Sequence, residues 1–376
     1  MLEEIMAYFK LATKNNYLMI IVPFVFVALL FIGCRFKKIR EWNDNYLSLK
    51  QINYIRGFCV LGILLHHVSQ VTAAEWIEYK YIIHGLDLFV DIGYLFVGLF
   101  LFVSGYGLYV SYKNKENYFK HYFIRRLLPV VLAFITTEAV YLLYKGIPST
   151  YTWYVYAILL CYLLFYIGFR FIKNEHISLL IVLIGIAAYC SFCWNFEYGG
   201  WWYNTVGLFC IGLVFAKYEK YIVNVMKKGY LPLIIITFAL MLVCRYYGKF
   251  YEASVYGIFD KEIIDLYNLY IILFRFAAAT LFTLLVLFVS LKVEFRNPIL
   301  LFYNSISLEF YLIQGLFVNM FGPYYMDPSI KSLYYIKNVP LLLLVCFVAS
   351  TISGLLLHYF DKAIVKLVNK IAVKNN

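Results

Sequence analysis

Residues 52–70 read Ile-Asn-Tyr-Ile-Arg-Gly-Phe-Cys-Val-Leu-Gly-Ile-Leu-Leu-His-His-Val-Ser-Gln, an apolar run with an arginine near its start and two adjacent histidines near its end. Ionisable groups inside a bilayer are costly, and their default interpretation is functional. Eleven residues of α-helix turn the chain by about 1100° and advance it by about 16 Å. Arg56 and His67 therefore lie on one stripe of a helix, whereas His66 points about 80° away from it. If one histidine acts with Arg56, the spacing favours His67.

The composition indicates a polytopic membrane protein. Of 376 residues, 64% are hydrophobic and only 14% are charged, and the mean hydropathy is +0.76. A soluble domain with this composition would have too little polar surface to cover itself. The formal net charge of +12 does not by itself indicate nucleic-acid binding, because lysine and arginine collect on the cytoplasmic loops of membrane proteins.

Apolar segments long enough to cross a membrane recur along the chain, so we expect an all-α, polytopic transmembrane helix bundle of about 11 spans. No soluble domain, internal repeat, pair of broken helices or cleaved signal peptide is expected. The expected spans are 17–34, 57–74, 92–112, 127–144, 153–169, 177–196, 198–216, 229–244, 266–291, 297–320 and 338–360.

Basic residues alternate in density between successive connections, which orients the array. The connections that follow odd-numbered spans, together with the carboxyl-terminal tail, carry 23 of the 33 Lys and Arg residues. The positive-inside rule places these connections in the cytoplasm. The amino terminus is therefore predicted outside and the carboxyl terminus inside.

The cysteines give no sign of a metal site or a disulfide framework. Almost all of the eight fall inside apolar runs. Cys190 and Cys193 form a C-x-x-C pair, but no second pair or nearby histidine accompanies them. We interpret them as buried thiols and expect no metal.

Four ionisable groups on different predicted helices reach similar depths in the membrane: His67, Glu138, Arg275 and Glu309. One interpretation is a structural ion-pair network that joins Arg275 to Glu138 or Glu309. The other is general-base chemistry, in which a carboxylate orients the ring of His67 and stabilises the imidazolium that forms. The residues alone leave both open.

A basic segment precedes the span that starts at Leu127. Residues 113–126 contain Lys120, Arg125 and Arg126, and Arg56 is predicted at the same membrane face. These groups are either ordinary cytoplasmic anchors or a cluster that binds the phosphates of a cytoplasmic co-substrate. No Gly-rich phosphate loop of the P-loop type occurs, so an ATP-driven mechanism has no support.

The Arg56–His67 spacing, R-x10-H, resembles the signature of the acyltransferase-3 family of integral-membrane O-acyltransferases. Further similar patterns follow in the same order: 91–97 leading to Ser104-Gly105-Tyr106, Arg125-Arg126-Leu127-Leu128-Pro129, residues 153–157 and residues 307–313. The resemblance covers about residues 50–360 and ten spans. It implies one membrane domain over 1–376, with an extra helix and linker over 1–49, an acyltransferase core over 50–360 and a basic tail over 361–376.

The resemblance implies transfer of an acyl group, usually acetyl, from acyl-CoA to a hydroxyl of a carbohydrate. Combined with the matching depths of the ionisable groups, it suggests that His67, oriented by Glu309 or Glu138, is the general base and that Arg275 stabilises the oxyanion. It assigns acyl-CoA binding to Arg56, Lys120, Arg125 and Arg126. Two positions depart from the family pattern: Phe123 replaces the first of two arginines spaced three apart, and Gln314 stands where many relatives have histidine.

Other function classes remain open at this stage. A transporter or flippase of a lipid-linked sugar would also place ionisable groups at the midplane, and a glycan polymerase would need a large outer loop that this chain lacks. The expected partners are acyl-CoA, a glycan or glycolipid acceptor and membrane lipids, with no nucleic acid. The expected location is the bacterial cytoplasmic membrane. Outward aromatic and acidic residues are either candidates for sugar contacts or an interfacial belt: Trp76, Tyr79, Tyr151, Trp201, Trp202, Tyr256, Asp260, Asp265 and Tyr324.

Overall fold

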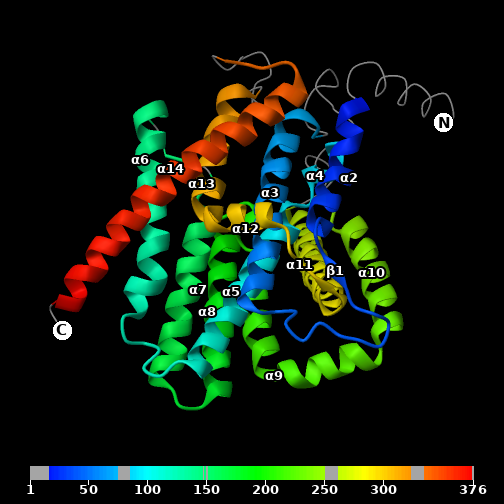
Figure 1. Cartoon of the computed structure of the whole chain (residues 1–376), viewed down its shortest axis with the longest axis vertical. Helices are drawn as coiled ribbons and strands as arrows, with labels where there is room; N and C mark the ends of the chain where they lie inside the picture. Colours follow the sequence, from blue (N-terminus) through cyan, green and yellow to red (C-terminus); the bar gives the residue numbers. More distant parts are fainter. Residues whose placement is uncertain are drawn as a thin grey trace.

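The computed structural model describes residues 17–74, 85–146, 148–149, 151–249, 261–322 and 334–374, and most of these are helical (Figure 1). Trp76, Tyr79, Tyr256, Asp260 and Tyr324 lie outside the described residues. The elements are α2 (Tyr17–Phe31), β1 (Arg35–Phe36), α3 (Leu49–Thr72), α4 (Asp87–Val90), α5 (Gly93–Asn114), the π-helix η2 (Phe123–Leu127), α6 (Leu128–Lys145), α7 (Trp153–Phe171), α8 (Glu175–Asn195), the 3-10 helix η3 (Gly200–Trp202), α9 (Leu208–Lys228), α10 (Tyr230–Tyr247), α11 (Lys261–Lys292), β2 (Val293–Glu294), α12 (Pro298–Ser305), α13 (Ser307–Phe321) and α14 (Val339–Lys374).

The helical membrane architecture is confirmed, but the spans differ in number from the prediction. Within the described residues, eight helices are long and apolar enough to cross a membrane, or nine if the bent pair α12–α13 counts as one span. Three of the eleven expected spans account for the difference. The first, 17–34, forms only the 15-residue helix α2.

The expected span 198–216 is only partly helical. After η3 the chain runs through a buried irregular connection, in which Asn204, Thr205 and Val206 are almost fully shielded, and α9 begins at Leu208. Irregular backbone at membrane depth is tolerated where protein surrounds it. Here the amide of Asn204 donates to the carbonyl of Gly200 at 2.9 Å. The helix then continues past a kink at Tyr218, and its second half lies across the lower end of the bundle (Figure 1).

The expected span 297–320 is broken into α12 and α13, which meet at 79°. Ile306 leaves the helical conformation at the break, with φ −110° and ψ 13°. The hydroxyl of Ser305 donates to the carbonyl of Phe302 at 2.7 Å, and such local side-chain bonds compete with helix continuation. A broken span was not predicted, because residues 300–314 contain no proline or glycine.

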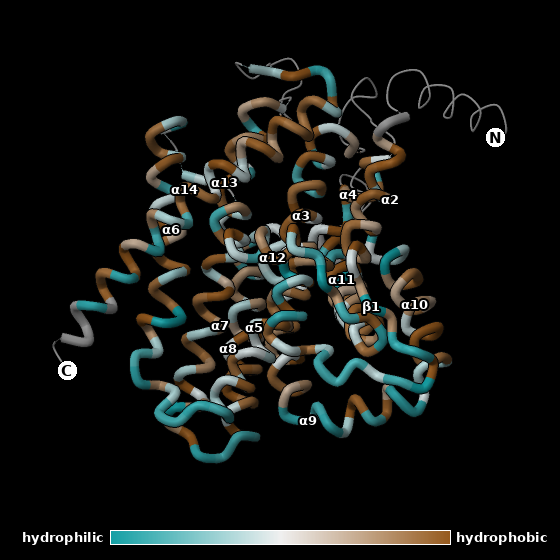
Figure 2. Tube along the Cα trace, in the orientation of Figure 1, coloured by the Kyte–Doolittle hydropathy of each residue, from teal (hydrophilic) through white to brown (hydrophobic). Residues whose placement is uncertain are grey.

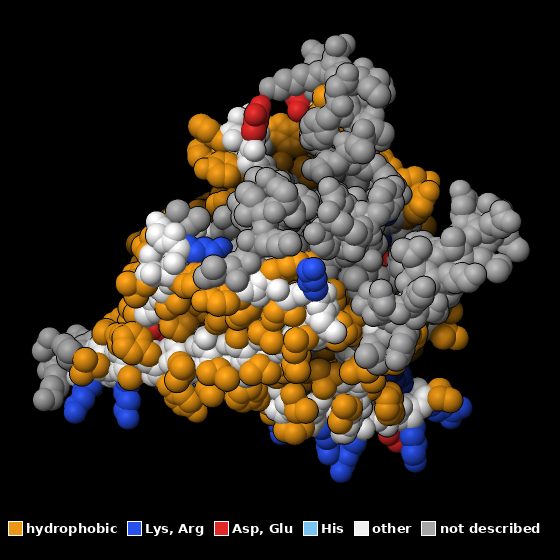
Figure 3. Space-filling view, turned by 90° about the horizontal axis from the view of Figure 1, so that it is seen from above, with side chains coloured by type: hydrophobic (Ala, Val, Ile, Leu, Met, Phe, Trp, Pro, Cys, Tyr) orange, Lys and Arg blue, Asp and Glu red, His pale blue; other side chains and the backbone are white. Residues whose placement is uncertain are grey.

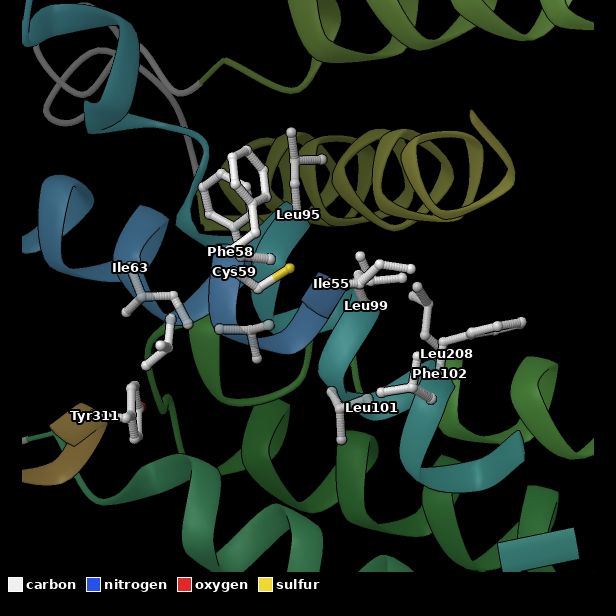
Figure 4. Packing of buried hydrophobic residues seen from close by; sticks show 14 of the residues in the cluster. Ile55, Phe58, Cys59, Ile63, Leu95, Leu99, Leu101, Phe102, Leu208 and Tyr311 are labelled. Atoms are coloured by element: carbon white, nitrogen blue, oxygen red, sulfur yellow. The ribbon is translucent and has the colours of Figure 1, made fainter. Parts of the chain in front are cut away.

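Helices α3 and α5 form the centre of the bundle. In their apolar windows 83% and 72% of residues are buried, against 11–39% for the other candidate spans. Small residues let neighbouring helices approach closely in membranes. A Cβ atom on Gly105 of α5 would lie 2.2 Å from the carbonyl oxygen of Phe209, and one on Gly212 of α9 would lie 2.1 Å from that of Phe102. Figure 4 shows the resulting core, with Phe102 and Leu208 on one side of α3 and Ile63 and Tyr311 on another.

The segment between α2 and α3 is bound to the connection between α11 and α12. Strands β1 and β2 pair antiparallel. The buried amide of Gln51 donates to the carbonyl of Phe295 at 3.0 Å and accepts from its amide at 2.9 Å. The ammonium of Lys292 lies 3.7 Å from the centre of the Trp42 ring. Hydrophilic segments gather at this lower end (Figure 2). Seen from above, hydrophobic side chains cover much of the visible face, and Lys and Arg gather toward one edge (Figure 3).

Candidate active site

A pocket lies between five helices, α3, α5, α6, α7 and α13. The space between its atoms is about 520 Å³, part of it open to solvent. Its lining is apolar and aromatic with one cation, as is common for sites that bury small molecules. The lining residues are Arg56, Ile63, Val97, Phe100, Ser104, Val130, Tyr154, Ile158, Tyr162, Ser307, Leu308 and Tyr311.

Arg56 is the cation of this pocket. Its guanidinium carbon lies 5.6 Å from the centre of the Phe100 ring, and its Nε is buried without a hydrogen-bond partner among the described residues. Buried polar groups are rarely left unpaired unless a ligand or water completes them. The open Nε therefore suits an anionic or hydrogen-bond-accepting ligand.

His67 lies one turn of α3 above Ile63, about 6 Å along the helix axis. Its side chain is buried, and its Nδ1 has no hydrogen-bond partner among the described residues. The ring centre lies 4.6 Å from that of Tyr151 and 6.3 Å from that of Tyr311. Because Tyr311 also lines the pocket, the pocket reaches the immediate surroundings of His67.

His66 has a different environment. Its Nδ1 lies 2.8 Å from the carbonyl oxygen of Phe89, and its ring covers Gly93, where a Cβ atom would lie 2.2 Å from the ring. His66 is therefore engaged by α4 and α5. The helical spacing predicted this division between the two histidines.

The carboxylates expected to orient His67 bond elsewhere. Oε1 of Glu309 lies 3.0 Å from Nδ1 of His358 on α14, and Oε2 of Glu138 accepts from the amide of Ser149 at 3.0 Å. Glu309 on α13 faces α14, and Glu138 on α6 faces the α6–α7 connection, so neither carboxylate bonds to His67 on α3. Matching depth in the sequence gave no information about rotation around each helix.

Arg275 pairs with neither Glu138 nor Glu309, so the interpretation as an ion-pair network between these residues is wrong. Its Nε donates to the carbonyl of Gly248 at 2.9 Å, and its Nη2 lies 3.9 Å from Oδ1 of Asp91. It lies beside the ring of Tyr94, on the side of α3 that His66 faces. The sequence analysis missed Asp91 as the acidic partner of Arg275. An ionisable residue at the start of a predicted span, just before α5, was the signal that could have identified it.

The basic segment before α6 approaches the inner end of α5. Nη2 of Arg126 donates to the hydroxyl of Ser111 at 3.2 Å. Ser111 is seven residues beyond Ser104 of the pocket, about 10 Å along one face of the helix. Arg125 and Arg126 belong to the π-helix η2, a conformation found often at functional sites. Lys120 and Arg125 are exposed, and no hydrogen bond or ion pair among the described residues joins them to the pocket wall.

Tyr118 is buried in the connection between α5 and η2. Burial raises the pKa of its hydroxyl, and the charge of Arg126 opposes that rise. Arg126 is therefore partly enclosed by an aromatic cluster rather than free in solvent.

Sequence reasoning missed several residues around the site. Tyr154, Tyr162 and Tyr311 line the pocket, and His358 bonds to Glu309. Gln314 is fully buried, with both amide atoms unpartnered in the described part of the chain. His358 and Asp361 are ionisable residues in or beside an apolar run, the same signal that identified Glu138.

A bundle of apolar helices around a pocket with an arginine in its wall, and a histidine beside one of its lining tyrosines, defines an integral membrane protein with a site between its helices. The chain belongs to the acyltransferase-3 family, whose model, described as an acyltransferase domain, matches residues 49–359. It is thus a membrane acyltransferase in the general sense of that family. No match was found among the curated proteins or among the solved structures.

Proposed function

We propose that this protein is a membrane O-acyltransferase that moves an acyl group, acetyl in the first instance, from cytoplasmic acyl-CoA to a hydroxyl of a cell-envelope glycan or glycolipid. The observation that carries it is the position of Arg56 in the pocket wall and of His67 beside Tyr311 of the same wall, in an acyltransferase-3 chain. Both residues have a buried nitrogen without a partner among the described residues.

The donor would enter from the basic end of the pocket. The phosphates of acyl-CoA would meet Arg126, Arg125 and Lys120, and Arg56 would bind an acceptor atom of the arm that carries the thioester. The lining between Arg56 and Tyr311 is mostly apolar, which suits a neutral acyl chain. A basic mouth also raises the local concentration of an anionic substrate.

His67 would act as the general base. A ring nitrogen takes the proton of the acceptor hydroxyl while its oxygen attacks the thioester carbonyl carbon. The C–S bond breaks, the sulfur leaves, and the proton passes to the thiolate, so that an ester and a thiol are formed. Proton transfer by a positioned side chain contributes about 10²–10⁴-fold in rate.

The carboxylates act as positioning residues in this scheme. Glu138 holds the connection that carries Tyr151, through the amide of Ser149. Glu309 holds His358 where α13 meets α14. We do not retain the oxyanion role for Arg275, because Gly248 and Asp91 engage its guanidinium.

The membrane orientation follows from the loop charges. We infer that the hydrophilic lower end in Figure 2 faces the cytoplasm of a bacterial cell. The amino terminus would then lie outside, the carboxyl terminus inside, and the α6–α7 connection on the acceptor side.

Membranes from cells that express the full chain provide the test, because they contain the native acceptor. They are incubated with acetyl-CoA that carries a radiolabelled acetyl group, and alkali-labile label in glycan and lipid fractions is measured. His67→Ala is expected to lower transfer by about 10²–10⁴-fold, while His66→Ala keeps transfer per mole of folded protein. Equal transfer by wild type and His67→Ala would refute the proposed chemistry.

One observation favours the alternative, a transporter or flippase of a lipid-linked sugar. The broken pair α12–α13 resembles the discontinuous helices of transporters. Among the described residues it has no counterpart elsewhere in the chain, whereas transporter repeats usually supply one. A flippase would leave no covalent label on the acceptor in the same experiment.

A further inference from the structure

His67 is enclosed from two sides by tyrosines of different elements. Tyr311 comes from α13 and separates His67 from the pocket, and Tyr151 comes from the α6–α7 connection. Only 8% of His67 is exposed. A general base so close to a substrate pocket is therefore shielded from water in the structure.

Tyr151 is held in place by several independent contacts. The hydroxyl of Tyr311 donates to the carbonyl of Tyr151 at 3.1 Å, and the amide of Tyr151 donates to the hydroxyl of Ser149 at 3.1 Å. The ring lies flat on Gly315 of α13, where a Cβ atom would lie 2.2 Å from it. Any side chain at position 315 would displace the ring, so α13 is shaped to accept Tyr151.

The carboxylate of Glu138 fixes the other end of this contact chain. Its Oε2 accepts from the amide of Ser149, and Ser149 in turn binds Tyr151. A half-buried carboxylate, a backbone turn, the hydroxyl of Tyr311 and a glycine thus act together to keep the Tyr151 ring against His67. Nothing in the assigned acyl-transfer chemistry requires that ring.

Resting on the proposed function, we propose that Tyr151 seals the acceptor side of His67 and thereby sets the ratio of acyl transfer to hydrolysis of the acyl donor. In hydrolysis a water oxygen attacks the thioester carbonyl carbon, the C–S bond breaks, and a carboxylic acid and a thiol form. His67 would activate water as readily as a sugar hydroxyl. Excluding water from a closed site prevents such side reactions.

The acceptor takes the place of the seal rather than passing beside it. When the Tyr151 ring moves away from His67, it leaves a space of the size of that ring. A flat sugar face fits such a space, since aromatic rings stack well on sugar faces. The hydrogen bond from Tyr311 to the carbonyl of Tyr151 is then the contact that links the donor pocket to the seal. Tyr151 is a specificity-determining residue because it distinguishes a bulky polyol from water.

The experiment separates the two products of the labelled donor. Membranes with the full chain receive acetyl-CoA with a radiolabelled acetyl group; label in the alkali-labile glycan and lipid fraction measures transfer, and free acetate measures hydrolysis. Tyr151→Ala is expected to raise the hydrolysis-to-transfer ratio about tenfold or more. Tyr151→Phe, which keeps the ring, is expected to stay near the wild-type ratio.

Gly315→Ala provides an independent variant in which neither tyrosine is mutated. Its added methyl group displaces the Tyr151 ring, so we expect the ratio to rise in the same direction. This variant also keeps the test decisive if Tyr151→Ala does not fold. The proposed role of Tyr151 would be wrong if the hydrolysis-to-transfer ratio were unchanged in Gly315→Ala and in folded Tyr151→Ala. It would also be wrong if these variants lost transfer and hydrolysis together.

The two proposals fail in distinguishable ways. If His67→Ala leaves transfer unchanged, the acyltransferase chemistry assigned to His67 is wrong. If His67→Ala abolishes both transfer and hydrolysis, and the Tyr151 and Gly315 variants keep the wild-type ratio, only the role of Tyr151 is wrong.

Discussion

At the scale of single residues, one helical step separates two histidines with different surroundings. His66 meets a backbone carbonyl at 2.8 Å, whereas the Nδ1 of His67 is buried without a partner in the described part of the chain. The difference follows from the 100° turn between successive residues of a helix. Adjacent identical side chains thus differ in chemistry because the helix turns them toward different neighbours.

Arg56 provides the first prediction at this scale. We expect Arg56→Ala to raise the KM for acetyl-CoA about tenfold or more with little change in kcat, since a hydrogen bond to a charged group contributes about 1.5–3 kcal/mol. Arg56→Lys should have a KM between those of the wild type and Arg56→Ala, because an ammonium lacks the planar, forked donors of the guanidinium. Initial-rate kinetics on membranes measure both constants.

Lys50→Ala serves as the matched control, because Lys50 is an exposed cation on the first turn of the same helix. The KM of Lys50→Ala for acetyl-CoA should stay within about twofold of the wild-type value, as expected for the loss of a solvated surface charge. A fall in kcat with an unchanged KM in Arg56→Ala would instead place Arg56 at the reacting atoms.

At the scale of elements, the contact of α5 with α9 depends on two glycines. The carbonyl oxygens of Phe209 and Phe102 occupy the space that side chains at Gly105 and Gly212 would need. Backbone atoms cannot turn aside as the end of a side chain can. The crossing therefore fixes the first half of α9 in the core although the charged second half leaves the bundle.

Gly212→Ala is expected to destabilise the protein by about 1–3 kcal/mol or more, the usual cost of overpacking a filled core. The apparent melting temperature of the detergent-solubilised protein measures this loss. Gly107→Ala on α5 is the control, because nothing lies within 4 Å of a Cβ atom there, and its melting temperature should be unchanged or higher. Equal stability of the two variants would contradict the packing account.

At the scale of the whole molecule, the orientation decides which substrate reaches which end of the pocket. The basic end must face the cytoplasm if acyl-CoA is the donor. Lys115 lies exposed in the connection between α5 and η2, at the basic end. Phe196 is 66% exposed and follows the last residue of α8, the end of that helix predicted to lie outside. These two positions therefore report on opposite sides.

Cysteines introduced at these positions, in a background without the native thiols, test the orientation. We expect Lys115→Cys to react with a membrane-impermeant maleimide only in inverted vesicles, and Phe196→Cys only in intact cells, as the positive-inside rule requires. The reverse pattern would place the basic mouth outside and exclude a cytoplasmic donor.

Much of the architecture could be predicted from the sequence because the bilayer imposes a simple length and charge rule. Long apolar runs gave most of the helices, including α3, α5 and α7. The rule failed where protein, not lipid, surrounds the backbone. Asn204, Thr205 and Val206 before α9, and Ile306 at the break, are buried in protein, so hydropathy gives no signal that the helix is interrupted there.

The sequence by itself determined the membrane class, the family and the shared stripe of Arg56 and His67, because hydropathy and helical period are properties of single segments. Only the tertiary structure decided the partners: His358 for Glu309, Asp91 for Arg275, and Tyr151 and Tyr311 for His67. Depth along a helix can be counted from the sequence, but the rotation of each helix against its neighbours depends on packing between distant segments. That rotation selects which side chains meet.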